Sequence, residues 1–258
     1  MKHYINRDYR NNLNNERFNF FNIKYREIDL LIAIDKNSSV EKIKNETFQF
    51  VKDLRIKFDN FINQNPIFQK SLKSIGKLES NNKIINYLIK ISKKVNMGPM
   101  AGIAGAFSEY TGKFLLNNYN ISEIIIENGG DIFLNTLKNV HISIFAGKSL
   151  LSEKVGLKIK PEETPMGIST SSATVGHSVS FGKADSVTIC SKDTVYSDFL
   201  ATKLCNMVKK DSDIDLVLDI AKKDKKIESA VVIYNNKAGF IGKHEIIKLN
   251  KKGENENN

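Results

Sequence analysis

Glycine is concentrated in one part of this chain, and that concentration limits what the chain can fold into. Of the 15 glycines in 258 residues, 11 lie between Gly98 and Gly182. Glycine costs backbone entropy and has no side chain to pack, so a cluster marks places where the backbone turns sharply or closely approaches another group. Hydroxyl and carboxylate side chains gather in the same region. This composition is typical of a polar ligand site, and we expect one that binds phosphate and a metal ion.

The apolar pattern predicts a mixture of strands and helices. Residues 18–35 are rich in strand formers, and apolar residues spaced by three and four predict a helix that starts at Val40 and ends before Pro66. Further helices are expected over 83–95 and 100–116. Because strands and helices do not alternate strictly, the pattern favours an α+β fold over a doubly wound sheet.

We expect one domain over residues 18–248, preceded by a flexible polar arm over 1–17 and followed by a disordered tail over 249–258. No apolar run approaches the roughly 18 residues of a membrane span, and the polar N-terminus lacks the apolar region of a signal peptide. Cys190 and Cys205 do not have the spacing of metal ligands, and they suit a reducing compartment. A cytoplasmic protein is the expectation.

The net charge of +10 raises the question of nucleic-acid binding. Only five of the 39 basic residues are arginines, and the last of them is Arg55. The glycine-rich half therefore has no guanidinium fork, on which the recognition of base edges often relies. The composition argues against a dedicated nucleic-acid partner, while a diffuse positive field still attracts small anionic ligands.

The expected helix over residues 100–116 has one face made of glycine and alanine. Gly102 and Gly105 lie on this face. Such a face allows close packing against another element of the chain or against a second copy in a homodimer. It equally suits a flat ligand whose phosphates lie at the start of the helix. The sequence leaves these alternatives open.

The segment Asn128-Gly129-Gly130 lies between two expected strands and predicts a hairpin turn. Turn formation explains the glycines but does not explain the carboxylate of Asp131 that follows them directly. Asp131 is therefore a candidate for ligand positioning or for acid–base chemistry.

A predicted loop begins at Gly167 and ends near His177. It contains the hydroxyls of Thr170, Ser171 and Ser172, which can donate hydrogen bonds to a phosphate. If this segment were instead a strand, alternate side chains would point away from the ligand. His177 suits either a structural role or that of a base. A Ser/His/Asp hydrolase site stays open, although the chain has no G-x-S-x-G elbow.

Asp198 and Thr202 are four residues apart on an expected helix, so both lie on one face. A carboxylate and a hydroxyl in this arrangement are suitable ligands for Mg²⁺, which prefers hard oxygens. The alternative is structural, because an aspartate in the first helical turn also suits the helix dipole.

Taken together, these segments resemble the ApbE-like superfamily, whose best-known members are Mg²⁺-dependent FAD:protein FMN transferases. The similar segments are MGPMAGIAGAFSEY, ENGGDIFL, STSSATVGHSVSFGKADSVTI and SDFLATKL, in this order. The resemblance is closer to a cytoplasmic branch known as an uncharacterised protein family. It covers residues 18–241 and implies an ApbE-like α+β fold with antiparallel sheets and packed helices.

The resemblance also implies roles for particular residues. Asn128–Asp131 matches a segment of the flavin site, Asp198 and Thr202 match the metal ligands, and His177 matches a histidine that follows a hydroxyl-rich segment. The implied cofactor is Mg²⁺, and the implied ligand is FAD, FMN or another phosphorylated small molecule. The reaction expected on this basis is phosphoryl or nucleotidyl transfer, or pyrophosphate hydrolysis.

One departure from the transferases affects this expectation. Their Gly-Gly-x-x-Lys-Gly segment corresponds to Ala-Gly-Ile-Ala-Gly-Ala here, and Gly105 stands where the lysine would be. The lost cationic contact weakens the case for FAD as substrate. The alternative function is a protein that binds a flavin or nucleotide without catalysis.

Overall fold

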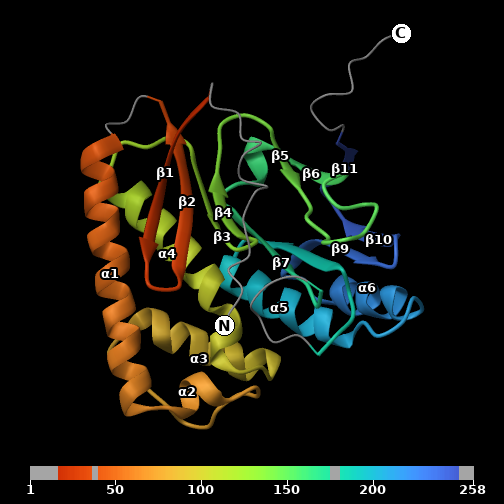
Figure 1. Cartoon of the computed structure of the whole chain (residues 1–258), viewed down its shortest axis with the longest axis horizontal. Helices are drawn as coiled ribbons and strands as arrows, with labels where there is room; N and C mark the ends of the chain where they lie inside the picture. The colour runs from red at the N-terminus through yellow and green to blue at the C-terminus, as the bar shows by residue number, and fades with distance from the viewer. Residues whose placement is uncertain (1–16, 37–39, 175–180, 250–258) are drawn as a thin grey trace.

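The computed structural model describes residues 17–36, 40–174 and 181–249, and it consists of two antiparallel sheets and a layer of helices (Figure 1). The larger sheet has eight strands, in the spatial order β1 (Phe18–Tyr25), β2 (Ile28–Asp35), β3 (Ile124–Asn128), β4 (Asp131–Asn135), β7 (Met166–Ser171), β8 (Ser186–Ser191), β9 (Ile227–Tyr234) and β10 (Lys237–Gly242). The smaller sheet has the order β11 (Glu245–Lys248), β6 (Val155–Ile159) and β5 (Val140–Ser143). The predicted α+β class is confirmed.

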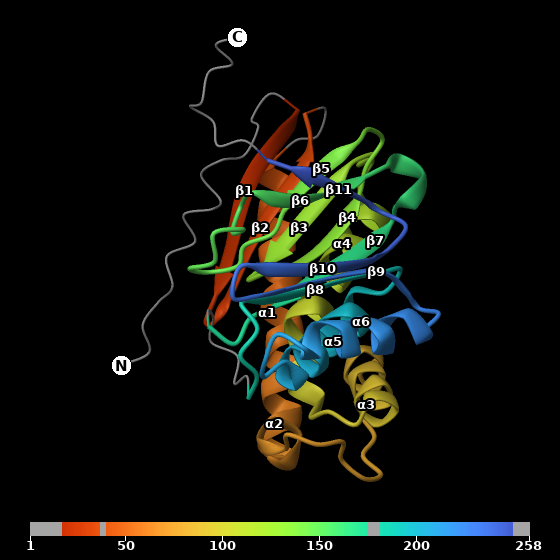
Figure 2. The ribbon, with the colours of Figure 1, turned by 90° about the vertical axis from the view of Figure 1, so that its right-hand side faces the viewer.

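Four of the helices cover one face of the larger sheet. The helices are α1 (Val40–Gln64), α2 (Ile67–Lys70), α3 (Lys83–Val95), α4 (Ile103–Asn118), α5 (Thr194–Met207) and α6 (Asp213–Lys223), with short 3₁₀ turns at Pro99–Gly102 and Pro161–Glu163. Helix α1 packs on β1, α4 on β3 and β4, α5 on β7 and β8, and α6 on β9 and β10. Helices α2 and α3 lie together at one end of the molecule (Figures 1 and 2).

The two faces of the larger sheet bury two hydrophobic cores. The main core lies between this sheet and the helices, and it includes the apolar face predicted for α1, from Ile43 to Phe61. The opposite face packs against the smaller sheet through residues such as Met166, Ile168 and Leu157. Strand β7 contributes Met166 and Ile168 to this second core, and its opposite face lies against α5.

The prediction of a loop that begins at Gly167 is wrong, because residues 166–171 form the strand β7 between β4 and β8. Glycine and hydroxyl residues are typical of loops, but here the small side chains allow α5 to lie directly on the strand. A Cβ atom added at Gly167 would lie 2.4 Å from the Cα of Thr194 in α5. Tertiary packing thus overrides the local preference of the sequence.

The described domain is held at both of its ends. Arg17 Nε donates a hydrogen bond of 3.1 Å to Glu123 Oε2, and the amide of Leu249 donates one of 2.8 Å to the carbonyl of Lys154. Arg17 and Leu249 thus make ordered contacts, each one residue beyond the predicted domain limits. Among the described residues, no helix combines the length and the apolar content that crossing a membrane requires.

His244 is buried between β10 and β11, where the chain passes from one sheet to the other. Its Nδ1 lies 2.6 Å from the hydroxyl oxygen of Ser229, and its Nε2 lies 3.8 Å from Glu163 Oε1 and 3.9 Å from Glu228 Oε2. Burial lowers the pKa of His244 below its usual value, although the two carboxylates act in the opposite direction. The folded state therefore favours the neutral ring.

Because protonation of His244 favours the unfolded state, it contributes a loss of stability as the pH falls below about 6.5, the ordinary pKa of histidine. We expect the difference in unfolding free energy between pH 7.5 and pH 5, measured with urea, to be smaller in His244→Gln than in the wild type. The exposed His141 on β5 provides a control, and His141→Gln should keep the wild-type difference. If the difference between pH 7.5 and pH 5 were the same in His244→Gln as in the wild type, a buried neutral His244 would be contradicted.

Candidate functional site

The predicted hairpin turn at residues 128–131 joins β3 to β4, and it is confirmed. Asn128 and Asp131 are paired across the hairpin. Gly129 and Gly130 have φ angles of +67° and +105°, a conformation that favours glycine. The turn is fixed by Glu127, whose Oε1 accepts a hydrogen bond of 2.9 Å from the amide of Gly130.

Both polar ends of this turn lie against the start of α4. Asn128 Nδ2 donates a hydrogen bond of 3.1 Å to the carbonyl of Ala104, and the hydroxyl of Ser108 donates one of 2.9 Å to the carbonyl of Asp131. Asp131 is buried, and it lies on the same face of β4 as Phe133, whose ring packs on Gly112 of α4. Asp131 therefore belongs to the layer between the sheet and the helices.

Helices α4 and α5 cap each other in this layer. Asp198 of α5 accepts a hydrogen bond of 2.8 Å from the amide of Gly105, in the first turn of α4, where the N-cap residue Gly102 has no side chain to do so. In return, Glu109 Oε2 of α4 accepts hydrogen bonds of 2.6 Å and 3.3 Å from the first two amides of α5, those of Thr194 and Val195. Each helix thus supplies a buried carboxylate to the positive end of the other.

The small face of α4 is occupied by α5 of the same chain. A Cβ atom added at Gly105 would lie 2.6 Å from the carbonyl oxygen of Thr194 and 2.9 Å from the Cβ of Asp198, and one added at Gly102 would lie 2.3 Å from the ring of Phe199. Close intramolecular packing therefore explains these glycines. The same contacts leave no room at residue 105 for a lysine side chain.

The carboxyl group of Asp198 is electrostatically unusual. Burial raises its pKa to about 7, although the amides of Gly105 and Ala104 favour the charged form. Asp198 forms no ion pair with a Lys or Arg side chain in the part of the chain that the structure describes. It also lies beyond the first turn of α5, which contains no acidic residue, so the simple dipole explanation for an aspartate does not apply.

Thr202 lies one turn after Asp198 on the same helix and is half-buried. Over the described ranges, no group of three or more His, Cys, Asp or Glu side chains lies close enough together to hold a metal ion. A cation at Asp198 would therefore complete its coordination with the Thr202 hydroxyl, backbone carbonyls, water and a bound ligand. Mg²⁺ is commonly held in this way, by one or two carboxylates together with waters and substrate phosphates.

The hydroxyl residues of β7 are divided between its two faces. Ser169 lies on the face covered by α5, with its hydroxyl 3.4 Å from the carbonyl of Thr194, whereas the hydroxyl of Thr170 bonds that of Thr188 at 2.8 Å. By alternation, Ser171 shares the face of Ser169, and its buried hydroxyl has no hydrogen-bond partner. Ser171 therefore lies on the same face of the sheet as Asp131, whereas the side chain of Thr170 lies on the opposite face.

Ser172 and His177 are the two remaining residues predicted from the sequence. Ser172 follows β7, is half-exposed, and its hydroxyl lies 3.2 Å from that of Thr174. His177 lies outside the described residues, so its predicted role stays a prediction. Glu109 is a further residue of this site that was not predicted, and its signal in the sequence is a carboxylate inside an otherwise small and apolar helical segment.

We expect Gly105→Ala to destabilise the protein by about 1–3 kcal/mol, because the added methyl group overpacks the contact between α4 and α5. Urea denaturation measures this loss. Gly76→Ala is the control, since nothing lies within 4 Å of a Cβ atom at that position. Equal stability of both variants would show that the helices do not touch closely at Gly105.

The pKa of Asp198 gives a second prediction, for the protein without divalent cations. A folded-state pKa of about 7, above the ordinary value of 3.8, means that wild-type stability falls as the pH rises through this window. Asp198→Asn keeps the acceptor for Gly105 but does not ionise. Relative to the wild type, we expect the variant to gain about 2.5 kcal/mol between pH 5 and pH 8 in urea denaturation with EDTA. Parallel pH profiles would refute a buried carboxyl of this kind.

The family model described as AbpE bacteria matches residues 10–233 of the chain. A UPF0280 protein of Methanocaldococcus jannaschii is 34% identical over 233 residues, which cover 88% of this chain and 92% of that relative. A UPF0280 protein of Methanococcus maripaludis strain C7 is 37% identical over 236 residues, which cover 89% of this chain and 93% of the relative.

Two solved structures are similar in fold. The flavinyl transferase ApbE of Pseudomonas stutzeri, in its apo form, has a TM-score of 0.57 at 12% identity and covers 90% of this chain and 96% of its own. The flavin transferase ApbE of Vibrio cholerae has a TM-score of 0.50 at 14% identity, and the match covers 90% of this chain and 97% of that structure. The ApbE-like fold expected from the sequence is confirmed by these likenesses.

Proposed function

The chain belongs to the AbpE bacteria family, and we propose that it processes a flavin or another phosphorylated ligand with the help of Mg²⁺. The observation that carries this proposal is the buried carboxyl of Asp198, which has a raised pKa and no Lys or Arg ion-pair partner among the described residues. A cation beside it would offset the cost of burying its charge. The similarity in fold to the flavin transferases supports a flavin as the ligand.

The residues present fit a hard cation. Asp198 uses one or two backbone amides of α4, and a carboxylate has about four acceptor positions, so it keeps capacity for a metal ion. Thr202 would provide a neutral hydroxyl one turn away. When bound, Mg²⁺ would supply charge neutralisation and Lewis acidity at a phosphate oxygen.

The other polar groups of this layer would position the ligand. The unpaired hydroxyl of Ser171 is buried on the face of β7 that α5 covers, and it would donate a hydrogen bond to an anionic oxygen. Asn128 and the tight turn at Gly129 and Gly130 would form the wall on the side of β3 and β4. Asp131 is the candidate for accepting a proton from an attacking group, and His177 is the second candidate.

Within this proposal, the reaction is phosphoryl or nucleotidyl transfer, or hydrolysis of a pyrophosphate. The glycine at residue 105 favours a second candidate function, a protein that binds a flavin or nucleotide without turnover. The close contact between α4 and α5 leaves no space there for a cationic side chain, so one means of stabilising phosphate charge is missing.

A product assay separates the two functions. Metal-free protein is incubated with FAD, with and without Mg²⁺, and FAD, FMN and AMP are then separated by chromatography. We expect Mg²⁺-dependent formation of FMN and AMP, reduced at least 100-fold in Asp198→Asn because the variant lacks the charge that binds the cation.

Asp219→Asn is the matched control, because Asp219 is an exposed aspartate on α6, outside the candidate site. This variant should keep full turnover. Retained FAD without any product would favour the binding protein. Equal turnover in Asp198→Asn and the wild type would overturn the assignment of the metal site.

A further inference from the structure

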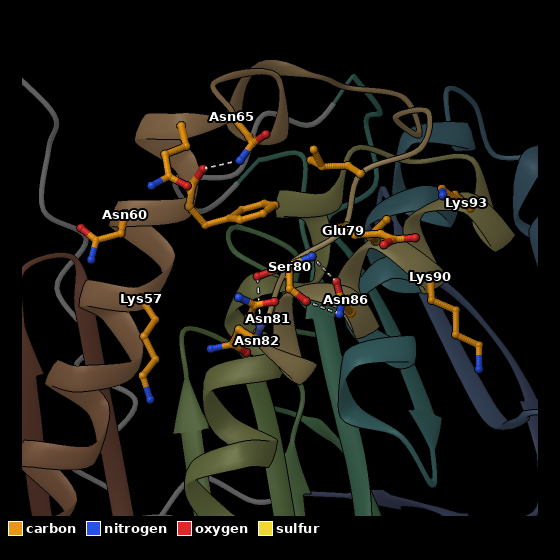
Figure 3. A pocket seen from close by; sticks show the side chains of 14 residues that line it. Lys57, Asn60, Asn65, Glu79, Ser80, Asn81, Asn82, Asn86, Lys90 and Lys93 are labelled. Atoms are coloured by element: carbon orange, nitrogen blue, oxygen red, sulfur yellow. Dashed lines mark hydrogen bonds between the residues drawn. The ribbon is translucent and has the colours of Figure 1, made fainter.

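A separate concave site lies at the helical end of the molecule (Figure 3). Its volume is about 1040 Å³, and it is formed by the C-terminal half of α1, residues 78–82 and α3. This volume is at the upper end of what small-molecule sites offer. None of the lining residues belongs to α4, α5 or a strand, so the groove is distinct from the site at Asp198.

The lining of this groove carries excess positive charge. It contains Lys57, Lys90 and Lys93 but only one carboxylate, that of Glu79. None of the three lysines forms an ion pair with any residue in the described ranges. Lys57 lies on the α1 side of the groove, and Lys90 and Lys93 lie on the α3 side (Figure 3). A ligand with more than one negative charge would be attracted to both sides at once.

The wall between the two helices is fixed by its own hydrogen bonds. The side chain of Asn86 holds the backbone of Ser80 on both sides, accepting from its amide at 2.8 Å and donating to its carbonyl at 2.6 Å. Asn82 caps α3 by accepting from the amide of Ile84 at 2.8 Å. The groove is thus preformed, which reduces the entropy lost when a ligand binds.

Other carboxamides of the groove remain available. Asn60, Gln64 and Asn81 are exposed, and their side chains make no hydrogen bond within the part of the chain that the structure describes. A carboxamide offers donors and an acceptor in one plane, which matches the edge of a nucleobase. Phe61 and Leu78 add apolar surface to the lining.

We propose that this groove binds a nucleoside polyphosphate. The base lies along the carboxamides and the apolar lining, and the phosphates lie beside the lysines as charge partners. The groove alone would bind this ligand, and catalysis at Asp198 is not required.

Isothermal titration of the full chain with ATP, and separately with inorganic tripolyphosphate, tests the proposal. We expect saturable ATP binding that weakens with added salt, and weaker binding of tripolyphosphate because it has no base. Lys57→Glu should weaken ATP binding about tenfold or more, since it replaces an attractive contact with a repulsive one.

Lys44→Glu is the matched control, because Lys44 is exposed on the same helix and does not line the groove. It makes the same change in charge and should leave ATP affinity within about twofold of the wild type. Asp198→Asn should also retain binding. The proposal is overturned by absent ATP binding, by equal loss in both lysine variants, or by loss in Asp198→Asn alone. Tripolyphosphate affinity equal to that of ATP would overturn recognition of the base.

Discussion

The mutual capping of α4 and α5 is the interaction on which the candidate site depends. Asp198 satisfies the start of α4, and Glu109 satisfies the start of α5. Both carboxylates are buried, so each would cost free energy without the amides that it binds. Because α4 packs on β3 and β4 while α5 packs on β7 and β8, this contact also aligns the hairpin at Asn128 with the polar face of β7.

The structural role of Asp198 as a helix cap is compatible with its proposed role as a metal ligand. The amides of a helix start contribute about half a unit of positive charge, which does not balance a buried carboxylate. The raised pKa of Asp198 reflects that remaining cost. A divalent cation would remove it, and the Thr202 hydroxyl stands one turn away on the same helix. The hydrogen bond to the start of α4 would then hold the carboxylate in place for a metal ion, as the hydrogen-bond partners of metal ligands commonly do.

Local patterns in the sequence predicted the elements that depend on local physics. The long amphipathic period of α1 and the turn residues Asn128–Gly130 were sufficient for those two elements. The strand β7 could not be predicted, because its glycine and serine residues are explained only by the approach of α5. Glu109 was missed for a related reason, since its partners are amides 85 and 86 residues away in sequence.

The groove between α1 and α3 also could not be predicted from local patterns in the sequence. Its lining comes from a helix, an asparagine-rich connection and a second helix, and no motif marks these residues as a set. Their common features are positive charge and unused carboxamides, which appear only when the elements are brought together (Figure 3). The net charge of +10 suggested anionic ligands in general, but it did not locate a site.

Counting the protons released when Mg²⁺ binds tests the proposed role of Asp198 most directly. Calorimetric titration of Mg²⁺ at pH 6.5, in two buffers with different ionisation enthalpies, gives this number. Because the pKa of Asp198 is about 7, the carboxyl is mostly protonated at this pH, and a cation must displace that proton. We predict release of more than half a proton per Mg²⁺ ion in the wild type and no such release in Asp198→Asn. Mg²⁺ binding without proton release, or the same release in both proteins, would contradict the assignment of Asp198 as the metal ligand.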